Sequence, residues 1–166
     1  MSKSGRPLFV NEELSQLRTK VMNGDIESVK TIMKKHGINA FDEEKMSALI
    51  WASYFGNMVI LKWLIANGAN VNHQDRGGTS ALHICGQEQN CEVAQVLINS
   101  GADINIKDEH DNSPLWTALF NAKGNFKLVK ILRTHGANPT SKNKYGLCPN
   151  DFAMKIYEKD VDELIK

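Results

Sequence analysis

The chain has 166 residues, of which 42% are hydrophobic, and a formal net charge of +1. This length corresponds to about one domain, and the apolar share is near that of globular proteins, so a continuous core can form. No run of about 18 apolar residues is present, which argues against a membrane span, and the apolar stretch near the N-terminus is too short for a secretory signal. We therefore expect a soluble cytoplasmic protein.

Two helices are predicted at the start of the chain, after a flexible tail over residues 1–10. Helical spacing begins near Asn11, and one face of the first helix carries Leu14, Leu17, Val21 and Met22. After a break at Gly24-Asp25, a second helix runs to His36-Gly37. Its inward residues are expected to be Ile26, Val29, Ile32 and Met33.

The stretch from Asp75 to Lys107 is repeated along the chain. Its phrase Ser80-Ala81-Leu82 has counterparts 33 positions away on either side, at Ser47-Ala48-Leu49 and Ser113-Pro114-Leu115. A second phrase recurs at Gly68-Ala69-Asn70, at Gly101-Ala102-Asp103 and, after two extra residues, at Gly136-Ala137-Asn138. A fourth, degenerate copy opens at Gly146. Such a period is the signature of a stacked repeat array.

Each copy follows one physical plan. A serine stands where a helix N-cap is needed, at Ser47, Ser80 and Ser113, and a glycine stands just past the second helix, at Gly68, Gly101 and Gly136. The first helices are predicted to end near Gly56, Gln89 and Gly124, and residues 69–78 and 102–111 to form long loops. Helices this short need neighbours to be stable. The expected core residues are Leu49, Leu82 and Leu115 with Ile60, Leu64, Val93, Leu97, Leu128 and Leu132.

These residues resemble the ankyrin-repeat family, whose pattern runs D-x-x-G-x-T-P-L-H and later G-A-D-x-N. The resemblance covers roughly residues 42–153. It implies an all-α ankyrin-repeat solenoid, with helix-turn-helix units joined by hairpin-like loops and with terminal capping repeats. We expect a single domain over residues 11–166. Its parts would be a cap at 11–41, repeats at 42–74, 75–107 and 108–142, and a C-terminal cap at 143–166 that ends the array, with no catalytic domain attached.

Chemistry-bearing residues are sparse. No phosphate-binding loop, nucleophile constellation or paired metal-ligand motif is present, so we predict no enzyme, no metal and no cofactor. The cysteines Cys85, Cys91 and Cys148 are read as small buried residues, and the alternative is a zinc site that uses His83 with Cys85 and Cys91. His83 alone keeps the motif histidine, and the resemblance gives it a packing and hydrogen-bonding role between units.

The resemblance also implies a binding surface for a protein partner, on the concave side built from hairpin tips and first helices. Carried over by position, the partner-binding residues are Glu43, Glu44, Met46, Tyr54, Phe55, Arg76, Gln87, Glu88, Glu109, His110, Phe120, Asn121, Lys144 and Tyr145. The aromatic residues Tyr54, Phe55 and Phe120 either anchor the partner or cover the seams between units. Trp51 and Trp63 are expected on inward, core positions, and Trp116 is left open.

Charge is unevenly distributed along the sequence. Residues 75–111 hold seven acidic residues against Arg76 and Lys107, whereas residues 112–150 hold six Lys or Arg and no Asp or Glu. The acids at the predicted tips either form a solvated face or steer a basic protein partner. The two extra residues, between Ala118 and Gly124, lengthen the first helix or its turn, as a surface insertion or as a partner contact.

Function is the least determined property. We expect a non-catalytic interaction module and a monomer, with nucleic acid disfavoured and no small-molecule substrate. The resemblance to stand-alone bacterial ankyrin arrays suggests an immunity protein that covers the active site of a cognate toxin, and the acidic tips suggest that this toxin is basic. The alternative is a cytoplasmic adaptor or regulator that docks on a resident protein.

Overall fold

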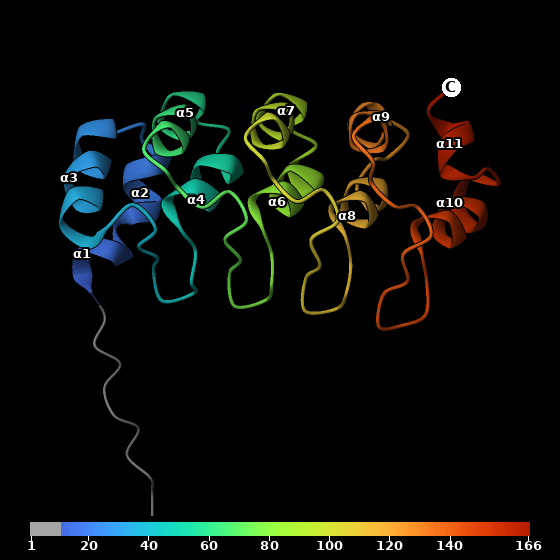
Figure 1. Cartoon of the computed structure of the whole chain (residues 1–166), viewed down its shortest axis with the longest axis horizontal. Coiled ribbons are helices and arrows are strands. Elements are labelled where there is room, and N and C mark those ends of the chain that lie inside the picture. The colour runs from blue at the N-terminus through green and yellow to red at the C-terminus, as the bar shows by residue number, and fades with distance from the viewer. Residues whose placement is uncertain (1–10) are drawn as a thin grey trace, which may run out of the picture.

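The computed structural model describes residues 11–166, so the predicted tail over residues 1–10 lies outside the described part. Figure 1 shows an array of helix pairs stacked side by side, with long loops that all leave the array on one side. The helices in order are α1 (Glu12–Ser15), α2 (Leu17–Met22), α3 (Ile26–His36), α4 (Ala48–Tyr54), α5 (Met58–Ala66), α6 (Ala81–Glu88), α7 (Cys91–Asn99), α8 (Pro114–Phe120), α9 (Lys127–Thr134), α10 (Pro149–Tyr157) and α11 (Val161–Leu164). The expected all-α solenoid is confirmed.

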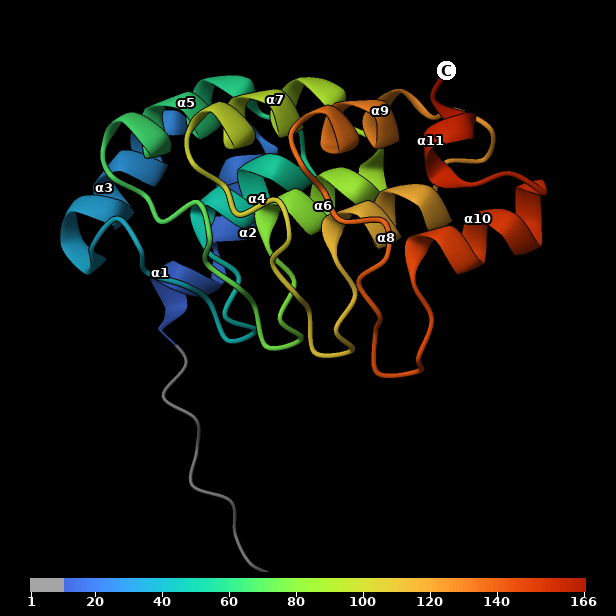
Figure 2. The same cartoon turned by 45° about the vertical axis from the view of Figure 1, so that its right-hand side comes forward.

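The helices form two rows. We call α2, α4, α6, α8 and α10 the inner helices, which lie next to the loops, and α3, α5, α7 and α9 the outer helices (Figures 1 and 2). Each inner helix packs against the inner helices before and after it and against the outer helix of its own unit. Isolated antiparallel bridges, Phe41 with Ser47 and Gln74 with Ser80, close the bases of the first two loops. The loops are therefore hairpin-like, as expected.

The core lies between the two rows and runs the length of the array. Every predicted core leucine, isoleucine and valine of the repeats is at most 2% exposed, and all belong to one continuous cluster. Because the inner helices α4, α6 and α8 have only seven or eight residues, they would be marginal in isolation. Packing between neighbouring units therefore supplies most of their stability.

The predicted caps are present at both ends of the helices. The hydroxyl oxygens of Ser47, Ser80 and Ser113 each accept a hydrogen bond from the backbone N–H three residues later. The sequence analysis missed an equivalent set on the outer helices, where Asp25, Asn57 and Asn90 accept from the N–H groups of Ser28, Ile60 and Val93. These caps explain why helices this short begin where they do.

Asparagine side chains join the bends between units. The Oδ1 atoms of Asn39, Asn72 and Asn105 accept hydrogen bonds of 2.7–2.8 Å from the backbone N–H groups of Asn70, Asp103 and Asn138, each one unit further along. Asn72 and Asn105 also donate through Nδ2 to the carbonyl oxygens of Gly101 and Gly136. Each unit thereby satisfies backbone groups of the next one, which fixes the register of the stack.

His83 performs the inter-unit role that the resemblance implied. Its Nδ1 accepts from the backbone N–H of Ser80 at 3.2 Å, and its Nε2 donates to the carbonyl oxygen of Asn112, in the following unit, at 3.0 Å. The side chain is 1% exposed. Burial lowers the pKa of the His83 imidazole below its ordinary value of 6.5. A protonated Nδ1 would also lose its ability to accept from Ser80.

Three expectations about individual side chains need correction. Met22 is 52% exposed, because α2 ends at this residue and its side chain lies outside the helix packing. Trp51 and Trp63 are half-buried rather than fully inside, although both pack against the core. The insertion, by contrast, gives one of the two outcomes expected for it: α8 ends at Phe120, and the extra residues lengthen the turn, in which the N–H of Ala122 donates to the Leu119 carbonyl.

Gly78 is predicted to be indispensable to the packing of neighbouring loops. Its φ is +74°, and an added Cβ would lie 2.7 Å from the backbone nitrogen of Glu109. Replacing Gly78 with alanine should therefore lower the free energy of unfolding by about 1–3 kcal/mol, measured by chemical denaturation. The adjacent Gly77→Ala is the matched control, since the nearest atom to its Cβ would be a side-chain oxygen at 3.5 Å. Equal losses for both variants would contradict the close approach.

The neutral state of His83 predicts a pH-dependent stability. Because folding depresses the pKa of His83, its contribution is fully present above pH 6.5, the ordinary value, and is lost as the pH falls towards the folded-state pKa. Wild-type protein should lose more unfolding free energy than His83→Gln between pH 7 and about pH 5. Parallel denaturation curves across this interval measure the difference, and identical pH slopes would refute it.

Candidate partner-binding surface

One surface position recurs on every inner helix. Gly24 and Gly56 are 32 residues apart, as are the N-caps Asp25 and Asn57. The inner-helix N-caps Ser47, Ser80, Ser113 and Cys148 then follow at intervals of 33, 33 and 35 residues. This register aligns two adjacent residue positions, which we call slots, at the C-terminal ends of successive inner helices. The first slot holds Met22, Tyr54, Gln87, Phe120 and Lys155, and the second holds Asn23, Phe55, Glu88, Asn121 and Ile156. We call these ten residues the inner row.

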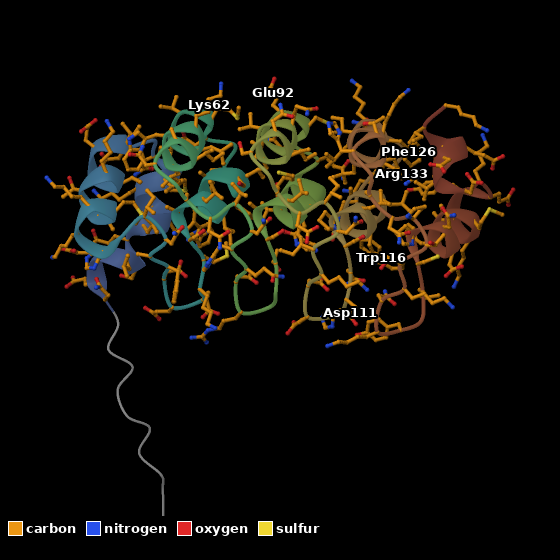
Figure 3. The ribbon with its side chains drawn as sticks, in the orientation of Figure 1. Lys62, Glu92, Asp111, Trp116, Phe126 and Arg133 are labelled. Atoms are coloured by element: carbon orange, nitrogen blue, oxygen red, sulfur yellow. The ribbon has the colours of Figure 1, made fainter. Side chains whose placement is uncertain are left out.

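The inner row faces the same side of the molecule as the loops. An open depression of about 470 Å³ is lined by Gln87, Phe120 and Asn121 of the inner row, by Trp116 and Thr117 of α8, and by Asp108 and Asn112 of the third hairpin. In Figure 3, Asp111 marks the end of that hairpin and Trp116 lies on α8, whereas Lys62 and Glu92 lie on the outer helices α5 and α7 at the opposite edge. The inner row and the hairpins therefore make up one face, which we call the inner face.

A first aromatic cluster lies on α4. Trp51, Tyr54 and Phe55 have ring centroids 5.1–6.0 Å apart, and the Arg18 guanidinium lies over the Trp51 ring at 5.2 Å. The indole N–H of Trp51 donates to Asp42 at 2.8 Å. Phe55 is half-buried against the core, while Tyr54 is 40% exposed. Tyr54 is thus a held aromatic side chain with a free outer surface.

A second aromatic cluster lies on α8 and α10. The Phe152 ring is 5.6 Å from both Trp116 and Phe120, and Tyr157 connects it to Phe126. Phe120 is 62% exposed despite these contacts. Trp116, which replaces the motif histidine, therefore packs within this cluster instead of bonding to the next loop. Phe120 covers the seam to the next unit through Phe152, Tyr54 contacts aromatic rings of its own unit, and both stay partly exposed, so their role as partner anchors stays a prediction.

The centre of the inner row is polar. Gln87 and Glu88 are both exposed at the end of α6, between the two aromatic clusters. Their unit has Gly86 where an inner helix would otherwise carry a side chain, and a Cβ there would lie 2.9 Å from the backbone nitrogen of Ala118. The inner face is therefore apolar at two separate places with a polar break between them.

The first acid of each hairpin has a structural role that the sequence analysis did not foresee. The Oδ1 atoms of Asp42, Asp75 and Asp108 each accept from the backbone N–H groups two and four residues later, at 2.7–3.0 Å. Asn143 makes the same pair of bonds in the fourth hairpin. Because a neutral asparagine serves equally, these side chains hold the turn and do not require charge.

Neighbouring tips are joined by their backbones. The N–H groups of Arg76, Glu109 and Lys144 donate to the carbonyl oxygens of Glu44, Gly77 and His110, at 3.1, 2.8 and 3.0 Å. We call these three bonds the tip ladder. It lines up the tips into one continuous ridge, from which Glu43, Glu44 and Glu109 project into solvent near the N-terminal and central units. Lys144 and Tyr145 project from the last tip.

Most of the predicted partner-binding residues are exposed on this face. They are Glu43, Glu44, Tyr54, Arg76, Gln87, Glu88, Glu109, His110, Phe120, Lys144 and Tyr145, while Phe55 and Asn121 are half-buried. Met46 was placed wrongly: it is 9% exposed and belongs to the core, because its main chain is bonded to Asp42 and its side chain turns inward just before the Ser47 cap. Whether the exposed residues bind a partner stays a prediction.

One exposed apolar residue was missed as a candidate. Met22 is 52% exposed and occupies an inner-row slot on the first unit, as Ile156, 53% exposed and expected on the concave side, does on the last. Met22 was assigned to the core by helical spacing alone. The 32-residue register from Met22 to Tyr54 was the signal that could have placed it.

The residues of the alternative zinc site are hydrogen-bonded or buried in ways that disfavour metal binding. Both ring nitrogens of His83 are hydrogen-bonded, and burial raises the pKa of the Cys85 thiol, which disfavours the thiolate that zinc needs. Within residues 11–166, no group of three or more His, Cys, Asp or Glu side chains is arranged to hold a metal ion. No helix in the same range has both the length and the apolar character to cross a membrane.

Comparisons with known proteins agree with the fold. A family model described as ankyrin repeats (3 copies) matches residues 17–108, and a model of a single ankyrin repeat matches residues 110–144. The chain therefore belongs to the ankyrin-repeat family. Ankyrin repeats are generally non-catalytic and bind proteins, and this chain is accordingly a protein–protein interaction module.

Its relatives include bacterial, animal, plant and viral proteins. The chain is 33% identical over 144 residues to the B-cell lymphoma 3 protein homolog of Mus musculus, a match that covers 86% of this chain and 31% of that protein. It is 32% identical over 148 residues to a putative ankyrin repeat-containing protein of Treponema pallidum, with 87% and 49% covered. A match to SH3 and multiple ankyrin repeat domains protein 2 of Homo sapiens is 26% identical and covers 70% and 6%. The chain spans less than half the length of each of these three relatives.

The turn-holding role of the hairpin acids predicts a difference between two substitutions. Asp75→Asn keeps an Oδ1 that can accept from Gly77 and Thr79, so its unfolding free energy should stay within about 0.5 kcal/mol of wild type. Asp75→Ala leaves both N–H groups without this partner and should cost about 1–2 kcal/mol. Chemical denaturation of the two variants measures this, and an equal cost for both would mean that the charge is what matters.

Proposed function

We propose that the chain binds a protein partner along its inner face, with Tyr54 and Phe120 as the main anchors. The supporting observation is that each ring is held in an aromatic cluster while 40% and 62% of its surface stays exposed. Aromatic side chains that are already ordered lose little conformational freedom on binding and dominate interface energies. The remaining exposed residues of the face would set specificity.

The finer form of the proposal is a cytoplasmic bacterial immunity protein that covers the active site of a cognate toxin. Glu43, Glu44 and Glu109 project from the tip ridge and do not hold a turn as Asp42, Asp75 and Asp108 do, although Glu44 lies 4.0 Å from Arg76 and Glu109 lies 3.5 Å from His110. Exposed carboxylates there would speed the approach of a basic toxin. Blocking a toxin requires tight binding, with a dissociation constant of about 1 nM or lower.

The second candidate is an adaptor or regulator that docks on a resident cytoplasmic protein. One observation favours it: three of the acids counted as tip charges hold their own hairpins, so the ridge is less acidic towards a partner than the sequence indicates. A contact carried by two aromatic anchors and few charges suits moderate affinity and depends weakly on salt.

Truncating either anchor should weaken partner binding with no loss of fold. Tyr54→Ala and Phe120→Ala are each expected to raise the dissociation constant by about tenfold or more, because hot-spot aromatics carry much of the binding energy. Val59→Ala, at a 68% exposed apolar residue of the outer helix α5, is the matched control. Affinity capture from the native cells followed by calorimetry with the captured protein provides the measurement.

The identity and affinity of that partner separate the two candidates. A stoichiometric secreted toxin bound at nanomolar strength supports the immunity role, and a resident protein bound more weakly supports the adaptor. Binding that is unchanged by Tyr54→Ala and Phe120→Ala, but lost with a substitution on the outer helices, would refute the inner face as the site.

A further inference from the structure

Between neighbouring hairpins, the ridge leaves no open edge for a partner strand. The tip ladder already pairs the N–H groups of Arg76, Glu109 and Lys144 with carbonyl oxygens of neighbouring tips. A strand that adds to an edge needs unpaired backbone groups to bond with. A helix satisfies its own backbone groups and binds through side chains alone, so it is the partner element that this face suits.

Exposed apolar residues lie on both sides of the polar centre of the inner row. Met22 and Tyr54 are 52% and 40% exposed on the N-terminal side, and Phe120 and Ile156 are 62% and 53% exposed on the C-terminal side. Gln87 and Glu88 lie between them. A helix laid along the row therefore needs two apolar side chains that are well separated, with a polar residue between them.

The separation follows from helix packing. Tyr54 on α4 and Phe120 on α8 are two inner helices apart, since α6 packs between them. Neighbouring packed helices lie about 8–10 Å apart, so the two anchors are about 16–20 Å apart along the row. At a rise of about 1.5 Å per residue this span equals about 11–13 residues, and 11 residues complete about three turns and return to the same helix face.

The charge at the centre of the inner row determines which residue type the partner helix needs between its two apolar side chains. Glu88 is exposed at the end of α6, in the second slot of the inner row. The nearby cation Arg76 lies 4.0 Å from the carboxylate of Glu44 and so is directed towards the first tip. A lysine or arginine at the middle of the partner helix would complement this centre, and an acid would be repelled.

Resting on the inner-face function proposed above, we propose that the partner docks an amphipathic α-helix along the inner row. Its apolar side chains lie 11 residues apart on one face, and a Lys or Arg between them faces Glu88. Tyr54 and Phe120 set the spacing, and Glu88 selects the charge.

Stapled helical peptides of fixed geometry test this directly on the full chain. The first peptide carries Leu at positions i and i+11 with Arg at i+4, which lies on the same helix face as both leucines. The second has the leucines at i and i+7 with the same Arg, and the third is the first with the Arg replaced by Glu. Fluorescence anisotropy should show the first peptide binding at least about tenfold more tightly than either of the others. Tyr54→Ala and Phe120→Ala should each abolish the preference for the i+11 spacing, and Val59→Ala should leave it unchanged.

A charge swap supplies a readout that altered folding would not produce. Glu88→Arg should reverse the order of the Arg-centred and Glu-centred peptides, because attraction and repulsion at the centre are exchanged. Equal affinity for the three peptides, or no measurable binding of any, would overturn the helix assignment. If the peptides fail this test but Tyr54→Ala and Phe120→Ala still weaken capture of the natural partner, the inner-face function stands and only the helix assignment is wrong. If the peptides are distinguished as expected but neither variant weakens capture of the natural partner, the proposed inner-face function is wrong.

Discussion

Contact between neighbouring units is the constraint on which the rest of the structure depends. Inner helices of seven or eight residues cannot persist alone, so each one is held by the helices beside it. Gly86 lets α6 approach the backbone of α8, and His83 reaches from α6 to the Asn112 carbonyl of the next unit. The asparagines at positions 39, 72 and 105 repeat the same kind of link at the bends. Because every unit is placed by its predecessor, the inner-row slots fall into line along one face.

Within each hairpin, one residue holds the turn and a different residue is exposed to a partner. Asp75 accepts two backbone hydrogen bonds of its own turn, whereas Arg76, the next residue, is exposed. The same order is found at Asp42 and Glu43, and at Asp108 and Glu109. Counting acids along the sequence therefore overstates the charge that a partner would meet. In the proposed binding mode, recognition at the ridge would rest on fewer carboxylates, and recognition at the inner helices on aromatic area.

The aromatic clusters occur where the chain departs from its repeat pattern. The unit that keeps the motif histidine, His83, has the polar pair Gln87 and Glu88 in its inner-row slots. The units on either side replace that histidine with Ile50 and Trp116 and carry Tyr54 and Phe120 in the exposed slots. Ile50 is fully buried, and Trp116 packs on Phe152, so stability comes from apolar packing where the hydrogen-bonded link is absent. The divergent units are thus the ones whose surfaces are best suited to binding.

The repeats, the helix caps at Ser47, Ser80 and Ser113, the leucine core and most of the exposed positions of the inner face could all be predicted from the amino-acid sequence. These features are local: a cap, a C′ glycine or a helical period acts over a few residues and is repeated at a fixed interval. Other features became visible only in the folded array: Met46 is buried, Met22 is exposed, Trp51 and Trp63 are half-buried, and the insertion extends a turn. The bonds of Asp42, Asp75 and Asp108 to their own hairpins belong to the same group. Each of these outcomes depends on which neighbour covers a side chain or supplies its hydrogen-bond partner, and that is set only when the units stack.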